Sequence, residues 1–302
     1  MAGVIEIMES VRTIVNHWAN TQVPLTADGN IGDTTLTIKT TNRFQVGDEI
    51  IIRDQVRGEI NNLVLSIPDQ VTLELTYPLT SNWPVSTGAL VQKVFNGQMI
   101  QGIYMGEPDN IPIMQGPAIT VRATTKDSEW LTIKSTKEDY KIEVTVYTKA
   151  AAQETGYKGN IRLAETIIYG LKKNIYPLVA PYTVVTLLVA NIGDVVIKVA
   201  DTTGLQSGSR IILEDQWQTD EHIVKRVIDS QTLELYEPVG CMFDMTDTPK
   251  MIVGQRFIYN SWPNNITYGE VFKGTLLKAA KITWFAWEEI LWLFPPRETF
   301  VH

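Results

Sequence analysis

The sequence predicts an α+β fold, in which two helices lie on a mostly antiparallel sheet and two small β-barrel-like modules are inserted into the chain. Three observations predict it. One segment occurs twice, a helical stripe of apolar residues precedes each copy, and much of the remaining chain alternates apolar and polar residues with the period of a strand. These patterns predict one discontinuous domain, residues 1–25, 96–182 and 249–302, interrupted by modules at 26–95 and 183–248.

The composition is that of a globular protein with an acidic surface. Hydrophobic residues make up 44% of the 302 residues and charged residues 20%, which excludes extended disorder. The net charge of −8 argues against a surface that wraps nucleic acid, because phosphate binding needs clustered Lys and Arg. The single cysteine, Cys241, excludes an intrachain disulfide and fits assembly in a reducing cytoplasm. No stretch approaches the ~20 apolar residues of a membrane span, and Glu6 and Glu9 do not suit a signal peptide.

The two predicted helices carry apolar stripes with helical spacing. The first covers residues 4–18, and its stripe consists of Val4, Ile7, Met8, Val11, Ile14, Val15 and Trp18. The second covers residues 160–173, and its stripe consists of Ile161, Ala164, Ile167, Ile168 and Leu171. Asn160 is the expected N-cap of the second helix, and Lys172 and Lys173 suit its C-terminal dipole.

The repeated segment spans residues 30–55 and 191–216 and needs no internal gap. Both copies open with Asn-Ile-Gly-Asp and close with Asp-Gln, and each is followed by Thr-Leu-Glu-Leu, at 72–75 and 232–235. The identical polar positions are Asn30/Asn191, Asp33/Asp194, Gln45/Gln206 and Asp54/Asp215. Chance similarity between β-rich segments is not expected at such turn positions. The sequence therefore predicts two copies of one β module, with hairpin bends at Asp69-Gln70 and Asp229-Ser230.

The chain outside the modules supplies the strands of the core sheet. "GQMIQGIYMG", "GPAITVRATT" and "DYKIEVTVYTK" alternate apolar and polar residues in the first remainder, and "QRFIYNSW" does so in the second. "TLLKAAKITWFAWEEI" fits a helix or a strand. Thr283-Trp284-Phe285 favours a strand there, because β-branched and aromatic residues suit a pleated surface.

No residue pattern of an active site appears in the sequence. None of the three histidines, His17, His222 and His302, has a Ser, Cys or acidic residue beside it in a nucleophile arrangement. Walker, dinucleotide-binding and zinc-protease motifs do not occur, and Asp33 and Asp194 suit turns better than calcium sites. The sequence therefore predicts a protein without catalytic activity, metal or cofactor.

Two segments are candidate contact surfaces for partners. The polar segment 148–160, "TKAAAQETGYKGN", is predicted to be a flexible loop that presents Lys149 and Lys158. The C-terminal stretch is predicted to be an arm that contacts a neighbouring subunit or layer, since aromatic residues carry much of the energy of protein interfaces. Its candidate contact residues are Trp287, Trp292, Leu293, Phe294 and Phe300. The alternative is that this stretch folds back into the core of its own chain.

The stretches "GPAITVRAT", "DYKIEVTVYTKAAAQETG" and "NIRLAETIIYGL" resemble the tail-terminator and tail-completion (neck) proteins of long-tailed bacteriophages. The pattern "T-T-x-F-x-V-G-D-x-I-x-I" of the first module, residues 40–52, is similar to add-on domains of phage structural proteins. The resemblance implies an α+β subunit of a homo-oligomeric ring, usually a hexamer, that caps the tail tube and joins tail to head in the virion. Implied partners are tube, sheath or connector proteins, with DNA passing through the lumen without specific binding.

The two insertions depart from the minimal form of that family. They leave open a different phage ring, such as a collar, a head-tail connector or a baseplate component. A second class is a carbohydrate-binding or cell-surface-binding protein, in which Trp83, Trp217 and Trp262 would be exposed and would stack on sugars. These tryptophans do not occupy matched positions in the two copies, which counts against a duplicated binding site.

Overall fold

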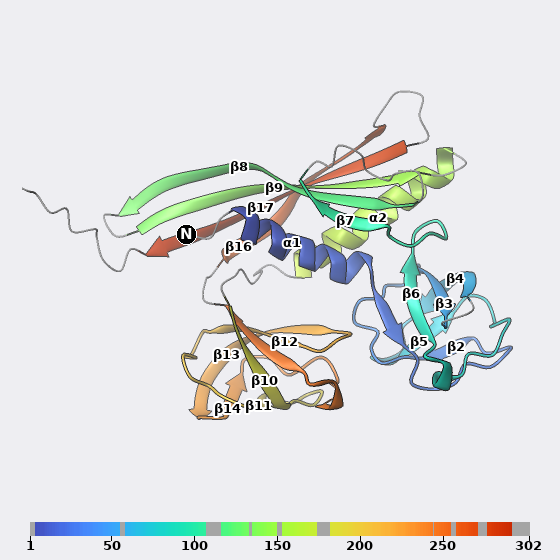
Figure 1. The fold of residues 1–302 in the computed structure, drawn as a ribbon, viewed down its shortest axis with the longest axis horizontal. Coiled ribbons are helices and arrows are strands. Elements are labelled where there is room, and N and C mark those ends of the chain that lie inside the picture. Colours follow the sequence, from blue (N-terminus) through green and yellow to red (C-terminus); the bar gives the residue numbers. More distant parts are fainter. Residues whose placement is uncertain are drawn as a thin grey trace, which may run out of the picture.

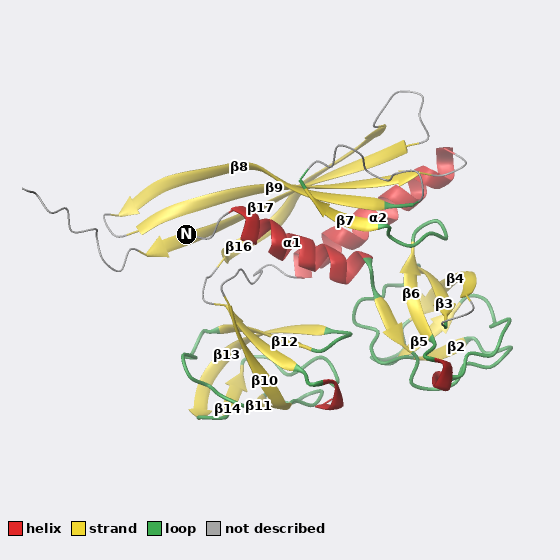
Figure 2. Cartoon of the chain, in the orientation of Figure 1, coloured by secondary structure: helices red, strands yellow, loops and turns green. Residues whose placement is uncertain are grey.

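The computed structural model describes residues 4–54, 58–106, 116–132, 135–149, 153–173, 182–243, 245–254, 258–270 and 277–291. These residues form two long helices, one large sheet and two smaller β units (Figures 1 and 2). The helices lie between the large sheet and the two β units (Figure 1). The fold is α+β and mostly antiparallel, as the sequence predicts.

The core sheet has five strands in the order β16-β17-β9-β8-β7. Their bounds are β7 Gly102–Met105, β8 Ala118–Thr132, β9 Ser135–Lys149, β16 Ile258–Glu270 and β17 Leu277–Leu291. Only the β7–β8 pair is parallel among these neighbours. The segment containing Thr283-Trp284-Phe285 is therefore a strand, as its β-branched and aromatic residues predict.

Helices α1 (Val4–Ala19) and α2 (Gln153–Lys173) cover one face of this sheet. The predicted stripes are confirmed. Their buried members are Ile7, Met8, Val11, Ile14, Val15, Trp18, Ala164, Ile167 and Leu171, while Val4, Ile161 and Ile168 are only partly buried. The helices meet closely at Gly170, where an added Cβ would lie 2.5 Å from the ring of Trp18.

The prediction of a flexible loop at 148–160 is wrong for the residues that the structure describes, because they belong to a strand and a helix. Lys149 ends β9, α2 begins at Gln153, and residues 150–152 lie outside the described part of the chain. Asn160 is therefore not an N-cap but lies inside the helix, where its Nδ2 donates to the carbonyl of Val146 over 3.2 Å. Gly159 does not end the helix either, because it lets α2 approach Asn96, whose Nδ2 would lie 2.0 Å from an added Cβ.

The first β unit contains six strands in the order β1-β6-β3-β4-β5-β2. Their bounds are β1 Gln22–Pro24, β2 Thr35–Thr37, β3 Glu49–Arg53, β4 Gly58–Ser66, β5 Thr72–Leu75 and β6 Leu90–Val94, with a 3-10 turn η1 at Val85–Thr87. An isolated bridge between Leu25 and Ile38 connects the two ends of this order.

The second β unit is a closed six-stranded barrel in the order β10-β11-β14-β13-β12-β15. Its strands are β10 Tyr182–Val189, β11 Val196–Val199, β12 Arg210–Glu214, β13 Thr219–Asp229, β14 Thr232–Leu235 and β15 Lys250–Gly254, with a 3-10 turn η2 at Met245–Asp247. Strands β1 and β15 pair within their β units, although the predicted boundaries at 26 and 248 left both outside.

Five strand pairings of the first β unit have counterparts in the second, and the isolated bridge between Leu25 and Ile38 stands where the second unit pairs β10 with β11. The pairs β1–β6, β3–β6, β3–β4, β4–β5 and β2–β5 match β10–β15, β12–β15, β12–β13, β13–β14 and β11–β14. This is the common strand order that a duplicated module requires.

The repeated polar residues form the same turns in both units. The amide of Asn30 donates to Asp33 over 2.8 Å, and that of Asn191 donates to Asp194 over 2.9 Å. Gly47 and Gly208 have φ angles of 88° and 87°, in the left-handed region that favours glycine. Identity at these polar positions therefore preserves backbone geometry.

Candidate functional site

The predicted contact residues do not gather at one place in the described structure. Lys149 pairs with Leu277 at one end of the core sheet, and Lys158 is exposed on α2. Trp287 is half-buried on β17, with the Lys137 ammonium 5.9 Å from its ring centroid. The remaining candidates Trp292, Leu293, Phe294 and Phe300 lie outside the described residues.

A different site appears where the two β units meet. The loop of the first unit from Lys39 to Arg43 contacts the barrel at three points. Lys39 Nζ lies 3.0 Å from Asp247 Oδ2, and Arg43 Nη2 donates to Thr219 Oγ1 over 3.0 Å. Asn42 Nδ2 donates to the sulfur of Cys241. These contacts join segments about 200 residues apart in sequence and fix the two units against each other.

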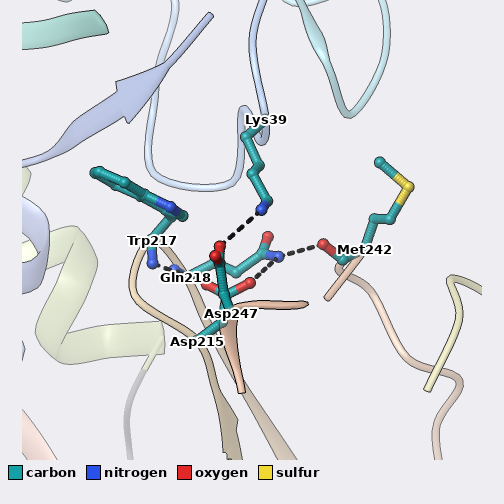
Figure 3. Close-up of polar contacts among 6 residues, drawn as sticks. All are labelled: Lys39, Asp215, Trp217, Gln218, Met242 and Asp247. Atoms are coloured by element: carbon teal, nitrogen blue, oxygen red, sulfur yellow. Dashed lines mark hydrogen bonds and ion pairs between the residues drawn. The ribbon is translucent and has the colours of Figure 1, made fainter. Parts of the chain in front are cut away.

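The barrel side of this contact is itself ordered by a polar network (Figure 3). Asp215 Oδ1 accepts from the backbone amides of Trp217 and Gln218, over 2.8 Å and 2.9 Å. Gln218 Nε2 donates to Asp215 Oδ2 over 3.0 Å and also to the carbonyl of Met242. Asp215 and Gln218 are buried, so the network holds the loop under Lys39 and Asp247 in one conformation.

A cleft of about 390 Å³ opens beside this contact. It is bounded by α1, α2 and both β units, and its lining residues are Trp18, Asn42, Arg43, Tyr169, Lys173, Thr219, Asp220, Glu221 and Glu237. Burial, and secondarily the charge of Asp220, raises the pKa of Glu221 to about 8. Burial lowers the pKa of Arg43 to about 10, which leaves its guanidinium charged at neutral pH.

One side-chain pair in this region was missed by the sequence reasoning. Asp220 Oδ2 lies 2.9 Å from His222 Nε2 without forming a hydrogen bond. The two residues lie on one strand two positions apart, and the period of a strand therefore predicts a shared face. Burial raises the pKa of the neighbouring Cys241 thiol, the opposite of what an activated nucleophile needs. Among the described residues, no group of three or more His, Cys, Asp or Glu side chains is placed to hold a metal ion.

His17, on α1 near this junction, should make the protein sensitive to acid. Burial, and secondarily the charge of Arg43, lowers the pKa of His17 from 6.5 to about 3. The unfolded chain then binds a proton between pH 6.5 and 3 that the folded chain does not, so this contribution is complete above pH 6.5 and is lost as the pH falls. His17→Gln should flatten the pH dependence in that window by at most about 1.4 kcal/mol per pH unit. Urea unfolding of both proteins at pH 7 and pH 4.5 tests this, and equal pH dependence would contradict it.

The core sheet presents two free edges in the part of the chain that the structure describes. Strand β7 pairs with β8 only from Ala118 to Val121, so the rest of β8 has a partner on one side only. Strand β16 pairs with β17 alone. Strands β8, β9 and β17 have 15 residues each, about 50 Å, whereas the 16 residues of α1 span about 24 Å. The three strands extend beyond the helices on one side (Figure 1).

No protein-family model matches the chain, and no curated protein matches it. Within the described residues, no helix combines the length and apolar character needed to cross a membrane. The surfaces that the structure offers are the two sheet edges, the junction of the β units and the faces of the β units.

Proposed function

We propose that this protein is a non-enzymatic structural subunit of a long-tailed bacteriophage, which forms the ring that caps the tail tube and joins it to the head. The observation that carries the proposal is that, among the described strands, β16 and the part of β8 beyond Val121 each have a neighbour on one side only. The assignment to the tail terminator, in preference to a collar, connector or baseplate ring, rests on the resemblance of the stretches between residues 116 and 171 to that family.

The two free edges suit head-to-tail assembly. Each neighbouring pair from β16 to β8 is antiparallel, so β8 of one copy can pair with β16 of the next copy in the same antiparallel sense. The contact joins two different surfaces of the subunit, and such heterologous contacts produce rings when the rotation between copies closes. Backbone hydrogen bonds along an added strand supply affinity without requiring a deep pocket.

Charged residues and a proline on these edge strands disfavour non-specific strand pairing before assembly. The free part of β8 carries Lys126, Asp127 and Glu129, and β16 contains Pro263, which lacks a backbone N–H. Natural proteins use such residues to suppress indiscriminate edge pairing. The net charge of −8 is consistent with a ring through which DNA passes without specific binding.

The carbohydrate-binding alternative receives less support from the tryptophans. Trp83 was expected to be exposed but is 1% exposed, because it belongs to the apolar cluster of the first β unit. Trp217 is half-buried. Trp262 is 42% exposed, as expected, but it lies on β16 of the core sheet and stacks on Phe285 with 6.1 Å between ring centroids. The two β units therefore lack a matched pair of exposed aromatic platforms at these positions.

Covalent capture of the edges tests the proposal. Thr125 on β8 and Asn265 on β16 are exposed, and the wild-type cysteine is buried, so Thr125→Cys/Asn265→Cys adds one reactive thiol to each edge. A short bifunctional maleimide should convert the double variant into a ladder of covalent oligomers that stops at the ring size. Either single variant alone should give dimers at most, because a head-to-tail contact brings two different edges together. A double variant that yields only dimers would contradict head-to-tail assembly.

A further inference from the structure

The outer face of the second β unit carries exposed apolar residues at three positions where the first unit has threonine, although the first unit exposes other apolar residues such as Ile31 and Tyr77. These three residues, here called the apolar patch, are Val195, Val196 and Tyr236, which are 43%, 43% and 60% exposed. The matched positions in the first unit are Thr34, Thr35 and Thr76. The β11–β14 pair has its counterpart in the β2–β5 pair of the first unit, so the fold of the module does not require these apolar residues.

The backbones of these residues are neighbours across three adjacent segments of the barrel, and Glu234 beside them is ion-paired with Lys225 and Arg226. Val196 pairs with Glu234, and the amide of Leu235 donates to the carbonyl of Val195 over 2.8 Å. The amide of Tyr236 donates to the carbonyl of Ile223, another exposed apolar residue, over 3.1 Å. With the exposed Ile192 of the same turn, which matches the exposed Ile31 of the first unit, these residues leave on the order of 400 Å² of apolar surface in water, within the range of patches that are often functional.

The size of the patch favours a short segment over a globular partner. A stable interface between two folded proteins buries about 800 Å² on each side, roughly twice what this patch offers. A short apolar peptide that inserts a few aromatic residues needs less area, because a few anchors carry most of the binding energy.

The chain itself contains such a segment beyond its last described strand. Strand β17 ends at Leu291, and the following residues include Trp292, Leu293, Phe294 and Phe300. This segment also carries Arg297, opposite in charge to the exposed Glu237 beside Tyr236. Its eleven residues, 292–302, reach at most about 36 Å when extended.

We infer that the apolar patch is the docking site for the C-terminal segment 292–300 of a neighbouring copy of this chain. The inference rests on the proposed ring function, and it names the surface that receives the arm. The edge contact between core sheets and the arm contact on the barrel would then connect the same two copies at two places, which increases the stability of the ring through effective concentration.

Photo-crosslinking in the full-length protein tests this inference. The variant Phe294→p-benzoylphenylalanine is prepared in isotopically heavy and light forms, which are mixed, assembled and irradiated. Mass spectrometry then identifies the crosslinked peptides and shows whether they come from one chain or from two. The expected products join residue 294 of one chain to the peptides that contain Val195, Val196 or Tyr236 of another chain, as heavy–light pairs. Val195→Thr/Val196→Thr/Tyr236→Thr, which installs the residues of the first unit, should reduce their yield about tenfold or more.

The matched control is Thr34→Val/Thr35→Val/Thr76→Tyr, which builds the same patch on the first unit and should leave the crosslinks to the second unit in place. Crosslinks at another surface, or an unchanged yield in the Val195/Val196/Tyr236 variant, would overturn the docking site. The mass of each sample separates this failure from that of the proposed function. A full ring with crosslinks elsewhere contradicts only the docking site, whereas a monomer with crosslinks within one chain contradicts both.

Discussion

Asp48→Ser should destabilise the protein by about 3–5 kcal/mol, because it leaves the ammonium of Lys93 buried without a counter-ion. Lys93 Nζ lies 2.7 Å from Asp48 Oδ2, and the Lys93 side chain is fully buried. The rings of Phe44 and Trp18 lie 5.7 Å and 6.0 Å from the ammonium, so the pair connects the first β unit to α1. Burial lowers the pKa of Lys93, and Asp48 opposes that shift.

The second β unit provides the control for this prediction. Ser209 and Val253 occupy the positions of Asp48 and Lys93, and Ile50 and Ile211 are their equivalent strand neighbours. Ser209 Oγ accepts the same turn hydrogen bond from Gln206 that Asp48 accepts from Gln45, so serine preserves the turn. Asp48→Ser/Lys93→Val should therefore recover stability to within about 1 kcal/mol of the wild type, since a buried ion pair can be replaced by apolar packing.

Urea unfolding of the wild type, both single variants and the double variant measures this coupling. If Asp48→Ser lowers the free energy of unfolding by less than about 1 kcal/mol, the ion pair does not stabilise the junction. A double variant as unstable as Asp48→Ser would contradict the prediction that apolar packing can replace the ion pair in the first unit. The valine at position 253 of the second unit would then need a different explanation.

Ile167→Asp should unfold the core, because it places a carboxylate without a partner between α2 and the sheet. Ile167 is 0% exposed and belongs to the apolar cluster shared by α1, α2 and the core strands. The loss of apolar burial and the cost of an unpaired buried charge together amount to several kcal/mol, a large fraction of the stability of a typical domain.

The matched control is Lys172→Asp, which introduces the same carboxylate at an exposed position of the same helix. Its expected cost is about 1 kcal/mol or less, from the unfavourable interaction with the helix dipole. Circular dichroism and thermal unfolding compare the two variants. Equal midpoints for Ile167→Asp and the wild type would show that this face of α2 is not buried.

The sequence predicted those parts of the fold that local periodicity determines. The stripe of α1 and the repeated turns at Asn30 and Asn191 require no knowledge of the rest of the chain, because a helix face and a turn are set by residues a few positions apart. The start of α2 was misread because Gly159 indicates a loop by propensity, whereas in the structure it permits close packing on Asn96. Tertiary contact outweighed local preference there.

The junction of the β units could not be predicted, since its contacts are long-range and its residue types are common on surfaces. Lys39 and Asp247 resemble solvated charges in the sequence, yet they form an ion pair across 208 positions. The two copies do differ at the loop that forms this junction. Lys39 and Arg43 correspond to Ala200 and Gly204, so the two basic residues occur only in the copy whose loop makes the contact.

The mass and symmetry of the purified full-length protein test the proposed assembly most directly. Native mass spectrometry and electron microscopy at micromolar concentration, without crosslinker, should show a closed ring of identical chains with sixfold symmetry. The edge strands β8 and β16 should lie at the contacts between neighbouring copies. A protein that stays monomeric at tens of micromolar, with both sheet edges open to solvent, would contradict the assignment as a ring subunit.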